Sequence, residues 1–140
     1  MIRLTDLVGQ DAVSLATAEK AGTVKGVIVS GNRIIGVELS DLTIPASAVR
    51  SFEGDVLTYD TTAAVEPGTG RNPIGMRVLD VHGDEHGTID DLHISANGTI
   101  ETIILNDGQT INGGRLHAIG SYAAILAAEL PPPSGRPVAQ

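Results

Sequence analysis

The stretch IGMRVLDVHGDEHGTIDDLHISANGTIETIILNDGQTINGGRLHAI, residues 74–119, decides the fold because it repeats the pattern of residues 8–52. Five short matches carry the repeat, and the offset between them stays at about 65 to 67 positions. They pair Val8-Gly9 with Ile74-Gly75, Gly22-Thr23-Val24 with Gly87-Thr88-Ile89, Val27–Ser30 with Leu92–Ser95, Val37–Asp41 with Ile103–Asp107, and Thr43–Pro45 with Thr110–Asn112. Several independent matches at one offset indicate an internal duplication.

The composition bounds the size and character of the core. A chain of 140 residues suits one ordinary domain or two very small ones. Hydrophobic residues make up 41% of the chain, but aromatic residues make up only 2%, so the core must be aliphatic. Seventeen glycines and many β-branched residues favour short strands joined by tight turns.

The order of the patterns predicts a first repeat at residues 1–58, a linker at 59–72, a second repeat at 73–128 and a flexible tail at 129–140. In each repeat, two alternating apolar runs flank a turn, as at 22–30 and 33–40. The linker holds Glu66-Pro67-Gly68, which regular elements do not tolerate. Residues 121–128 are ambiguous: their alanines favour a helix, whereas alignment with the first repeat favours a short closing strand, which we prefer.

Each repeat therefore contains about five or six short strands in roughly 55 residues. A small antiparallel meander exposes its edge strands unless it closes on itself, and closure into a barrel removes those edges. The sequence predicts an all-β fold in which two tandem small antiparallel β-barrels pack together.

A family resemblance follows from the same residues. The first repeat reads Leu-Val-Gly at 7–9, Gly-Thr-Val-x-x-Val-x-Val at 22–29, Ile-x-Gly-Val-x-Leu at 34–39 and Ile-Pro at 44–45. This pattern resembles the PRC-barrel domain, the small β-barrel shared by the photosynthetic reaction centre H subunit and the ribosome maturation factor. The resemblance covers roughly three quarters of the chain, although Thr102 replaces Gly36 and Asn112 replaces Pro45 in the second repeat. It implies a binding or assembly module and brings no catalytic residues with it.

The charge balance narrows the partners. The net charge is -8, and each half of the chain carries -4. Clustered Lys and Arg are needed to bind phosphate backbones or anionic lipid, so we expect no direct nucleic-acid partner and no direct membrane insertion. The chain has no cysteine, no recognisable signal peptide and no apolar run approaching 18 residues. We expect a cytoplasmic protein; a peripheral place at a membrane complex, through a partner, stays open.

The segment from residue 80 to residue 93 is the strongest candidate for chemistry. His82, Asp84 and His86 lie in its predicted hairpin loop, and imidazole together with carboxylate suits Zn, Ni or Mn. The alternative is a polar loop whose side chains do not converge. Acid–base catalysis by Asp84, Glu85, Asp90 and Asp91 would need a pocket that the sequence does not indicate. We expect no enzyme activity and no cofactor, with a metal ion as the open exception.

Other positions are predicted to be structural. Gly9, Gly22, Gly75 and Gly87 are expected at turns or bulges that require glycine. The expected core comprises Val24, Val27, Val29, Val37, Leu39, Ile89, Leu92, Ile94, Ile103 and Leu105. Lys25-Gly26 in the first repeat aligns with Asp90-Asp91 in the second, which would suit either two different partner surfaces or drift after duplication.

These observations favour a non-enzymatic protein-binding or assembly module that acts as an adaptor or scaffold in a larger complex. We expect it to form a homo-oligomer, most simply a dimer. One alternative is a metal-binding or metal-responsive protein that uses residues 80–93. Another is an RNA-processing or ribosome-assembly accessory factor, which would have to contact a ribosomal protein because the chain is acidic.

Overall fold

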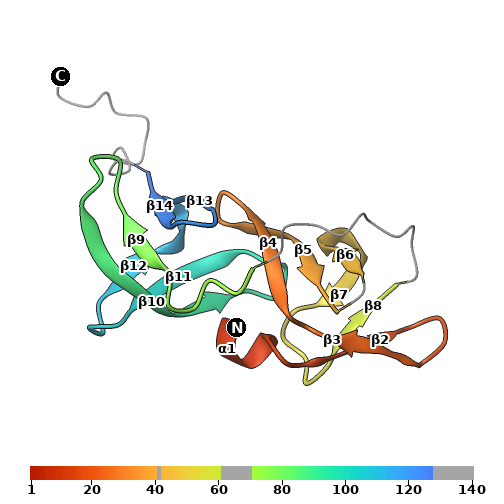
Figure 1. Cartoon of the computed structure of the whole chain (residues 1–140). Coiled ribbons are helices and arrows are strands. Elements are labelled where there is room, and N and C mark those ends of the chain that lie inside the picture. The colour runs from red at the N-terminus through yellow and green to blue at the C-terminus, as the bar shows by residue number, and fades with distance from the viewer. Residues whose placement is uncertain (41, 61–70, 128–140) are drawn as a thin grey trace, which may run out of the picture.

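The computed structural model describes residues 1–40, 42–60 and 71–127, and strands dominate this part of the chain (Figure 1). Its single α-helix is one turn long, α1 (Leu4–Leu7), and follows the short strand β1 (Ile2–Arg3). The prediction of an all-β fold is confirmed.

The first half contains seven further strands and one 3₁₀ turn. They are β2 (Asp11–Ser14), β3 (Lys20–Thr23), β4 (Gly26–Ser30), β5 (Arg33–Glu38), β6 (Thr43–Pro45), η1 (Ala46–Ala48), β7 (Val49–Ser51) and β8 (Leu57–Tyr59). The second half contains β9 (Arg77–Leu79), β10 (Glu85–Ile94), β11 (Ile100–Leu105), β12 (Thr110–Asn112), η2 (Gly113–Arg115), β13 (Leu116–Ile119) and β14 (Ala124–Leu126). The ambiguous segment therefore contains a strand, β14, and the predicted tail lies outside the described residues.

The two halves use the same strand pairings. In the first half β2 pairs with β3 and, in parallel, with β8, while β8 also pairs with β7. In the second half β9 pairs with β10 and, in parallel, with β14, while β14 also pairs with β13. The hairpin β4–β5–β6 likewise matches β10–β11–β12, so β10 replaces both β3 and β4.

Single hydrogen bonds repeat as well, at the offset found in the sequence. The Gly9 amide donates to the Val24 carbonyl over 2.8 Å, and the Gly75 amide donates to the Ile89 carbonyl over 2.7 Å. All four predicted structural glycines have positive φ: 97° at Gly9, 148° at Gly22, 84° at Gly75 and 121° at Gly87. A side chain is strained in that backbone region, which explains why glycine occurs at these positions in both repeats.

The expected closure of each repeat into its own barrel does not occur. The strand order of the larger sheet is β12-β11-β10-β9-β14-β13, and no pairing among the described residues joins its two ends. The first half forms two separate sheets, β3-β2-β8-β7 and β4-β5-β6. The physical reason is that each half covers strand edges of the other, so neither has to close on itself.

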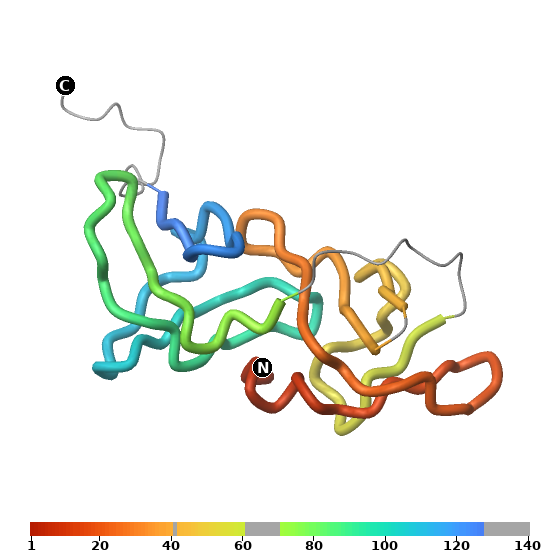
Figure 2. Tube along the Cα trace, in the orientation of Figure 1, coloured from red at the N-terminus to blue at the C-terminus, as the bar shows by residue number. Residues whose placement is uncertain are grey.

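The segments just before the two matched stretches, residues 8–52 and 74–119, cross over to the opposite half. Ile2 and Arg3 pair with Ile94 and His93 of β10, and α1 packs on the same strand, as the red segment beneath β10 shows in Figure 2. In the opposite direction, Arg71 forms an antiparallel bridge with Val27 of β4, with N···O distances of 2.8 and 3.0 Å. Each half therefore contributes a segment that pairs with a strand of the other half.

The centre of this arrangement is a bridge between equivalent residues, Arg33 and Thr99. The Ile34 amide donates to the Gly98 carbonyl over 2.8 Å, and the Ile100 amide donates to the Asn32 carbonyl over 2.7 Å. Ile34 is equivalent to Ile100, and Asn32 is equivalent to Gly98, so exchanging the two halves turns one of these bonds into the other. The halves are therefore related like the subunits of a two-fold dimer.

The core follows the sequence pattern and runs through both halves. Nine of the ten expected core residues are buried, and the exception is Val29, which is half-buried. Apolar side chains of both halves form one cluster, which Leu4 and Leu7 of α1 join. The duplicated halves therefore share a core larger than either could form alone.

Candidate functional site

The predicted metal-binding loop is organised by Asp80, at the end of β9. One carboxylate oxygen, Oδ1, accepts hydrogen bonds from the backbone amides of His82 and Asp84, over 2.8 and 3.1 Å. The other, Oδ2, lies 2.9 Å from Nε2 of His86. The bond with His86 is the main cause that lowers the pKa of Asp80 to about 2, and the two amide bonds add to it.

This geometry brings together only part of the predicted ligand set. His82 and Asp84 contribute backbone amides to the turn, while His86 meets Asp80, which was not among the predicted ligands. In residues 1–40, 42–60 and 71–127, no three His, Cys, Asp or Glu side chains gather so that they could hold a metal ion. The metal site stays a prediction. The sequence feature that could have predicted this turn is the Asp-x-His-x-Asp spacing of residues 80–84, because the Asp80 side chain accepts hydrogen bonds from the amides of residues 82 and 84.

Two of the positions where the repeats differ in charge face the opposite half. Asp91 is buried, and its carboxylate accepts hydrogen bonds from the Thr5 amide over 3.2 Å and the Thr5 hydroxyl over 2.7 Å. At the equivalent position, Gly26 lies so close to Arg71 that a Cβ atom would be 2.6 Å from its carbonyl carbon. These two positions fasten the crossing segments and are not partner surfaces.

A groove lies between β4 of the first half and β13 of the second. It is partly open to solvent, and the described residues that line it are Val27, Ile28, Val29, Arg71, Pro73 and Ile119. Val27 and Pro73 are buried, whereas the other four are half-buried. Five of the six lining residues are apolar, and Arg71 supplies the charged group.

The equivalent place on the second half is filled. The counterparts of the six groove residues at the repeat offset are Leu92, His93, Ile94, Thr5, Leu7 and Phe52. Strand β1 covers this place by pairing with His93 and Ile94, and Phe52 is only 3% exposed. The Phe52 ring lies against Gly98, where a Cβ atom would be 2.9 Å from it. Among the described residues, the groove is thus the open counterpart of a site that the chain fills with its own strand.

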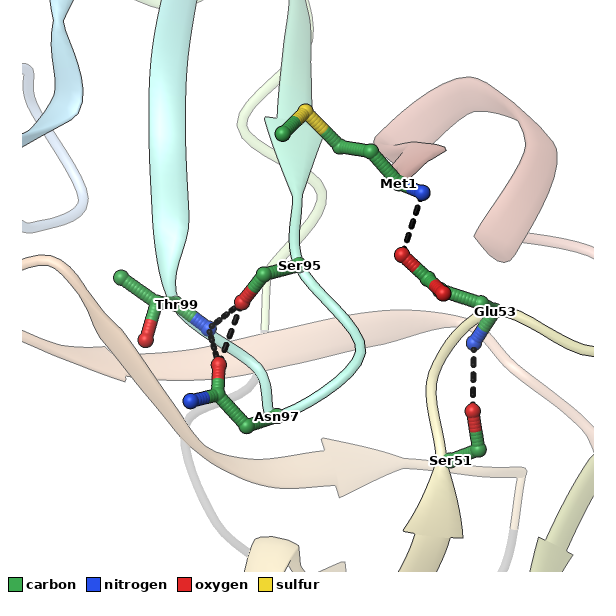
Figure 3. A network of polar contacts seen from close by, with 6 residues as sticks. All are labelled: Met1, Ser51, Glu53, Ser95, Asn97 and Thr99. Atoms are coloured by element: carbon green, nitrogen blue, oxygen red, sulfur yellow. Dashed lines mark hydrogen bonds and ion pairs between the residues drawn. The ribbon is translucent and has the colours of Figure 1, made fainter.

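Two separate groups of polar contacts lie at the rim of the filled site. Figure 3 shows Ser95, Asn97 and Thr99 joined in the turn, opposite the loop after β7. In that loop Glu53 forms an ion pair with the Met1 amino group, and its own amide donates to the Ser51 hydroxyl over 3.1 Å. The filled site is therefore held by polar contacts at its rim as well as by Phe52.

Comparison of the sequence with models of known protein families and with curated proteins gives no match to either. Within the described residues, no helix has the length and apolar character needed to cross a membrane.

Proposed function

We propose that this chain is a non-enzymatic protein-binding module that acts as an adaptor or scaffold in a larger complex, in line with the PRC-barrel domains that its sequence resembles. The observation that carries the proposal is the set of open strand edges. In the part of the chain that the structure describes, the larger sheet ends at β12 and β13, and the three-stranded sheet ends at β6. Such edges present backbone N–H and C=O groups that pair readily with another chain.

The exposed apolar side chains support the same proposal. Ile35, Val81 and Tyr122 are 50%, 55% and 69% exposed. The Tyr122 ring is held in place by Arg77, whose guanidinium carbon lies 4.9 Å from the ring centre. Tyrosine and arginine are frequent anchors in protein interfaces, and a side chain that is already ordered loses less entropy on binding.

The expected homo-oligomer remains part of the proposal, with a dimer as its simplest form. The two halves of one chain already join through backbone hydrogen bonds arranged about a two-fold axis. Strand edges of this kind are suited to pairing with a second copy of the chain in the same way. Light scattering coupled to gel filtration tests this part directly. A mass of 14.4 kDa, that of a single chain, at all concentrations would contradict it.

The adaptor role is tested by affinity capture of the tagged protein from its own cells, with and without RNase. A reproducible protein partner that RNase treatment leaves in place supports the proposal. A contact that RNase abolishes would instead support the RNA-processing alternative. Absence of any partner would contradict the adaptor role.

The metal-binding alternative rests on one observation, the contact between Asp80 and His86 in the β9–β10 hairpin. Two donors of suitable type already lie 2.9 Å apart, and a metal ion would need further ligands from elsewhere. Calorimetric titration with Zn, Ni and Mn at neutral pH decides the question. Heat equal to that of buffer alone would exclude the alternative.

A further inference from the structure

We propose that the groove between β4 and β13 is a docking site for an extended, apolar segment of a partner protein that carries a carboxylate. The inference rests on the proposed protein-binding function and names the surface that would perform it. It starts from the relation between the groove and the filled site on the second half.

The filled site shows which ligand shape this surface accepts. There, an extended two-residue strand, Ile2–Arg3, adds to the edge of β10 in antiparallel orientation, and its isoleucine is 9% exposed. On the first half, the described pairing along the same edge of β4 is a single bridge from Arg71 to Val27. Ile28 and Val29, the equivalents of the residues that β1 covers, line the groove instead.

A second difference enlarges the groove. Phe52 closes the filled site, but its equivalent at the groove is the smaller Ile119 of β13. Val29 was expected in the core from its sequence pattern and is half-buried. Apolar side chains gathered at a partly open groove are typical of a surface that a ligand covers.

The charge of the lining indicates the chemistry of the segment. Arg71 is the one charged residue among the six described lining residues, in a chain whose net charge is -8. No ion pair or hydrogen bond joins its guanidinium to another described residue. An extended segment that places aliphatic side chains on Ile28 and Val29 and a carboxylate near Arg71 would complement both features.

Two capped peptides test the proposal on the full-length protein: acetyl-Thr-Ile-Glu-Val-Thr-Ser-amide and the same peptide with lysine in place of glutamate. We expect the glutamate peptide to shift the amide NMR signals of Val27, Ile28, Val29 and Ile119. The lysine peptide should bind about two- to fivefold more weakly, as the loss of one exposed charge pair predicts. In Arg71→Glu this preference should reverse.

Two variants and one matched control separate docking from general effects. Ile119→Phe introduces the residue type that closes the filled site, and Ile28→Glu places a charge in the groove; each should weaken peptide binding at least about tenfold, as the loss of a central contact does. Leu15→Glu should leave affinity unchanged, because Leu15 is 48% exposed and does not line the groove.

Two results would overturn the docking site. One is that the peptides leave the signals of the lining residues unmoved. The other is a set of nuclear Overhauser contacts, in the free protein, between residues 61–70 and Ile28 or Val29, because the chain itself would then occupy the groove. If cellular capture yields a partner that Ile119→Phe retains in full, this inference fails while the proposed function stands. If capture yields no partner, the proposed function fails.

Discussion

Arg33 and Thr99 face each other in an antiparallel bridge although they occupy equivalent positions in the two repeats, 66 residues apart. A pairing of equivalent residues places a two-fold axis between them, as in a symmetric dimer. The two repeats therefore form one structural unit in which each half completes the other.

The crossing of residue 71 over β4 depends on Gly26. We predict that Gly26→Ala destabilises the protein by about 1–3 kcal/mol, because its Cβ would meet backbone atoms that cannot move away as a side chain could. Urea denaturation measures the change. Gly120→Ala is the control, since the nearest atom to its Cβ would be 4.0 Å away, and an equal loss in both variants would contradict the account.

The crossing of α1 over β10 depends on the bond between the Thr5 hydroxyl and the buried Asp91 carboxylate. Thr5→Val removes this bond and leaves a buried charge with one donor fewer, so stability should fall by about 1–3 kcal/mol. Chemical denaturation provides the measurement, with Thr17→Val in an exposed turn as control. If the Thr5 variant is no less stable than the Thr17 variant, the bond contributes nothing.

The ring of Phe52 joins the first half to the β10–β11 turn. Phe52→Ala should cost about 3–5 kcal/mol, the usual loss for a buried aromatic ring, and should speed amide exchange at Gly98. Tyr122→Ala, in which the ring removed is 69% exposed, should cost no more than about 1 kcal/mol. Thermal unfolding with hydrogen exchange checks both, and similar losses in the two variants would count against the role of Phe52.

The lowered pKa of Asp80 predicts how the stability of the fold changes at acid pH. Its pKa in the fold is about 2, below its ordinary value of 3.8, so the ionised form is favoured in the folded state. The stability that this provides is complete above about pH 4 and is lost as the pH falls toward 2. His86→Gln removes the main cause and should raise the pKa of Asp80 toward 3.8. A carboxyl-carbon NMR titration measures it.

His82→Gln is the matched control for the acid dependence, because residue 82 reaches Asp80 through its backbone amide and keeps that amide in the variant. The pKa of Asp80 should stay near 2 in this variant. A pKa that is unchanged in His86→Gln, or that rises equally in both variants, would show that the contact with His86 is not its cause.

The sequence predicted the local structure of the fold better than its global arrangement. The spacing of glycine and aliphatic residues was enough to predict the strands, the turns and the equivalence of positions such as Gly9 and Gly75, because these are local requirements. The crossing segments could not be predicted, since Ile2 and Thr5 meet β10 some ninety residues later. Closed barrels were expected because an edge covered by the other half leaves no local signal.

In the candidate site, too, the local structure could be predicted from the sequence and the arrangement in space could not. The hairpin turn at Asp80 is encoded within a few residues, whereas the groove depends on a comparison of both halves in space. Phe52 and Ile119 occupy equivalent positions, yet only the structure shows that one closes a site and the other leaves it open. The alignment of Gly26 with Asp91 indicated a difference in charge, and its role in fastening the crossing segments became evident from the contacts with Arg71 and Thr5.

The most direct test of the central claim, that the halves join through reciprocal bonds about a two-fold axis, is NMR detection of scalar couplings across hydrogen bonds. The account predicts one coupling from the Ile34 nitrogen to the Gly98 carbonyl carbon and a matching one from the Ile100 nitrogen to the Asn32 carbonyl carbon. Absence of both couplings, with rapid exchange of these two amides, would contradict it.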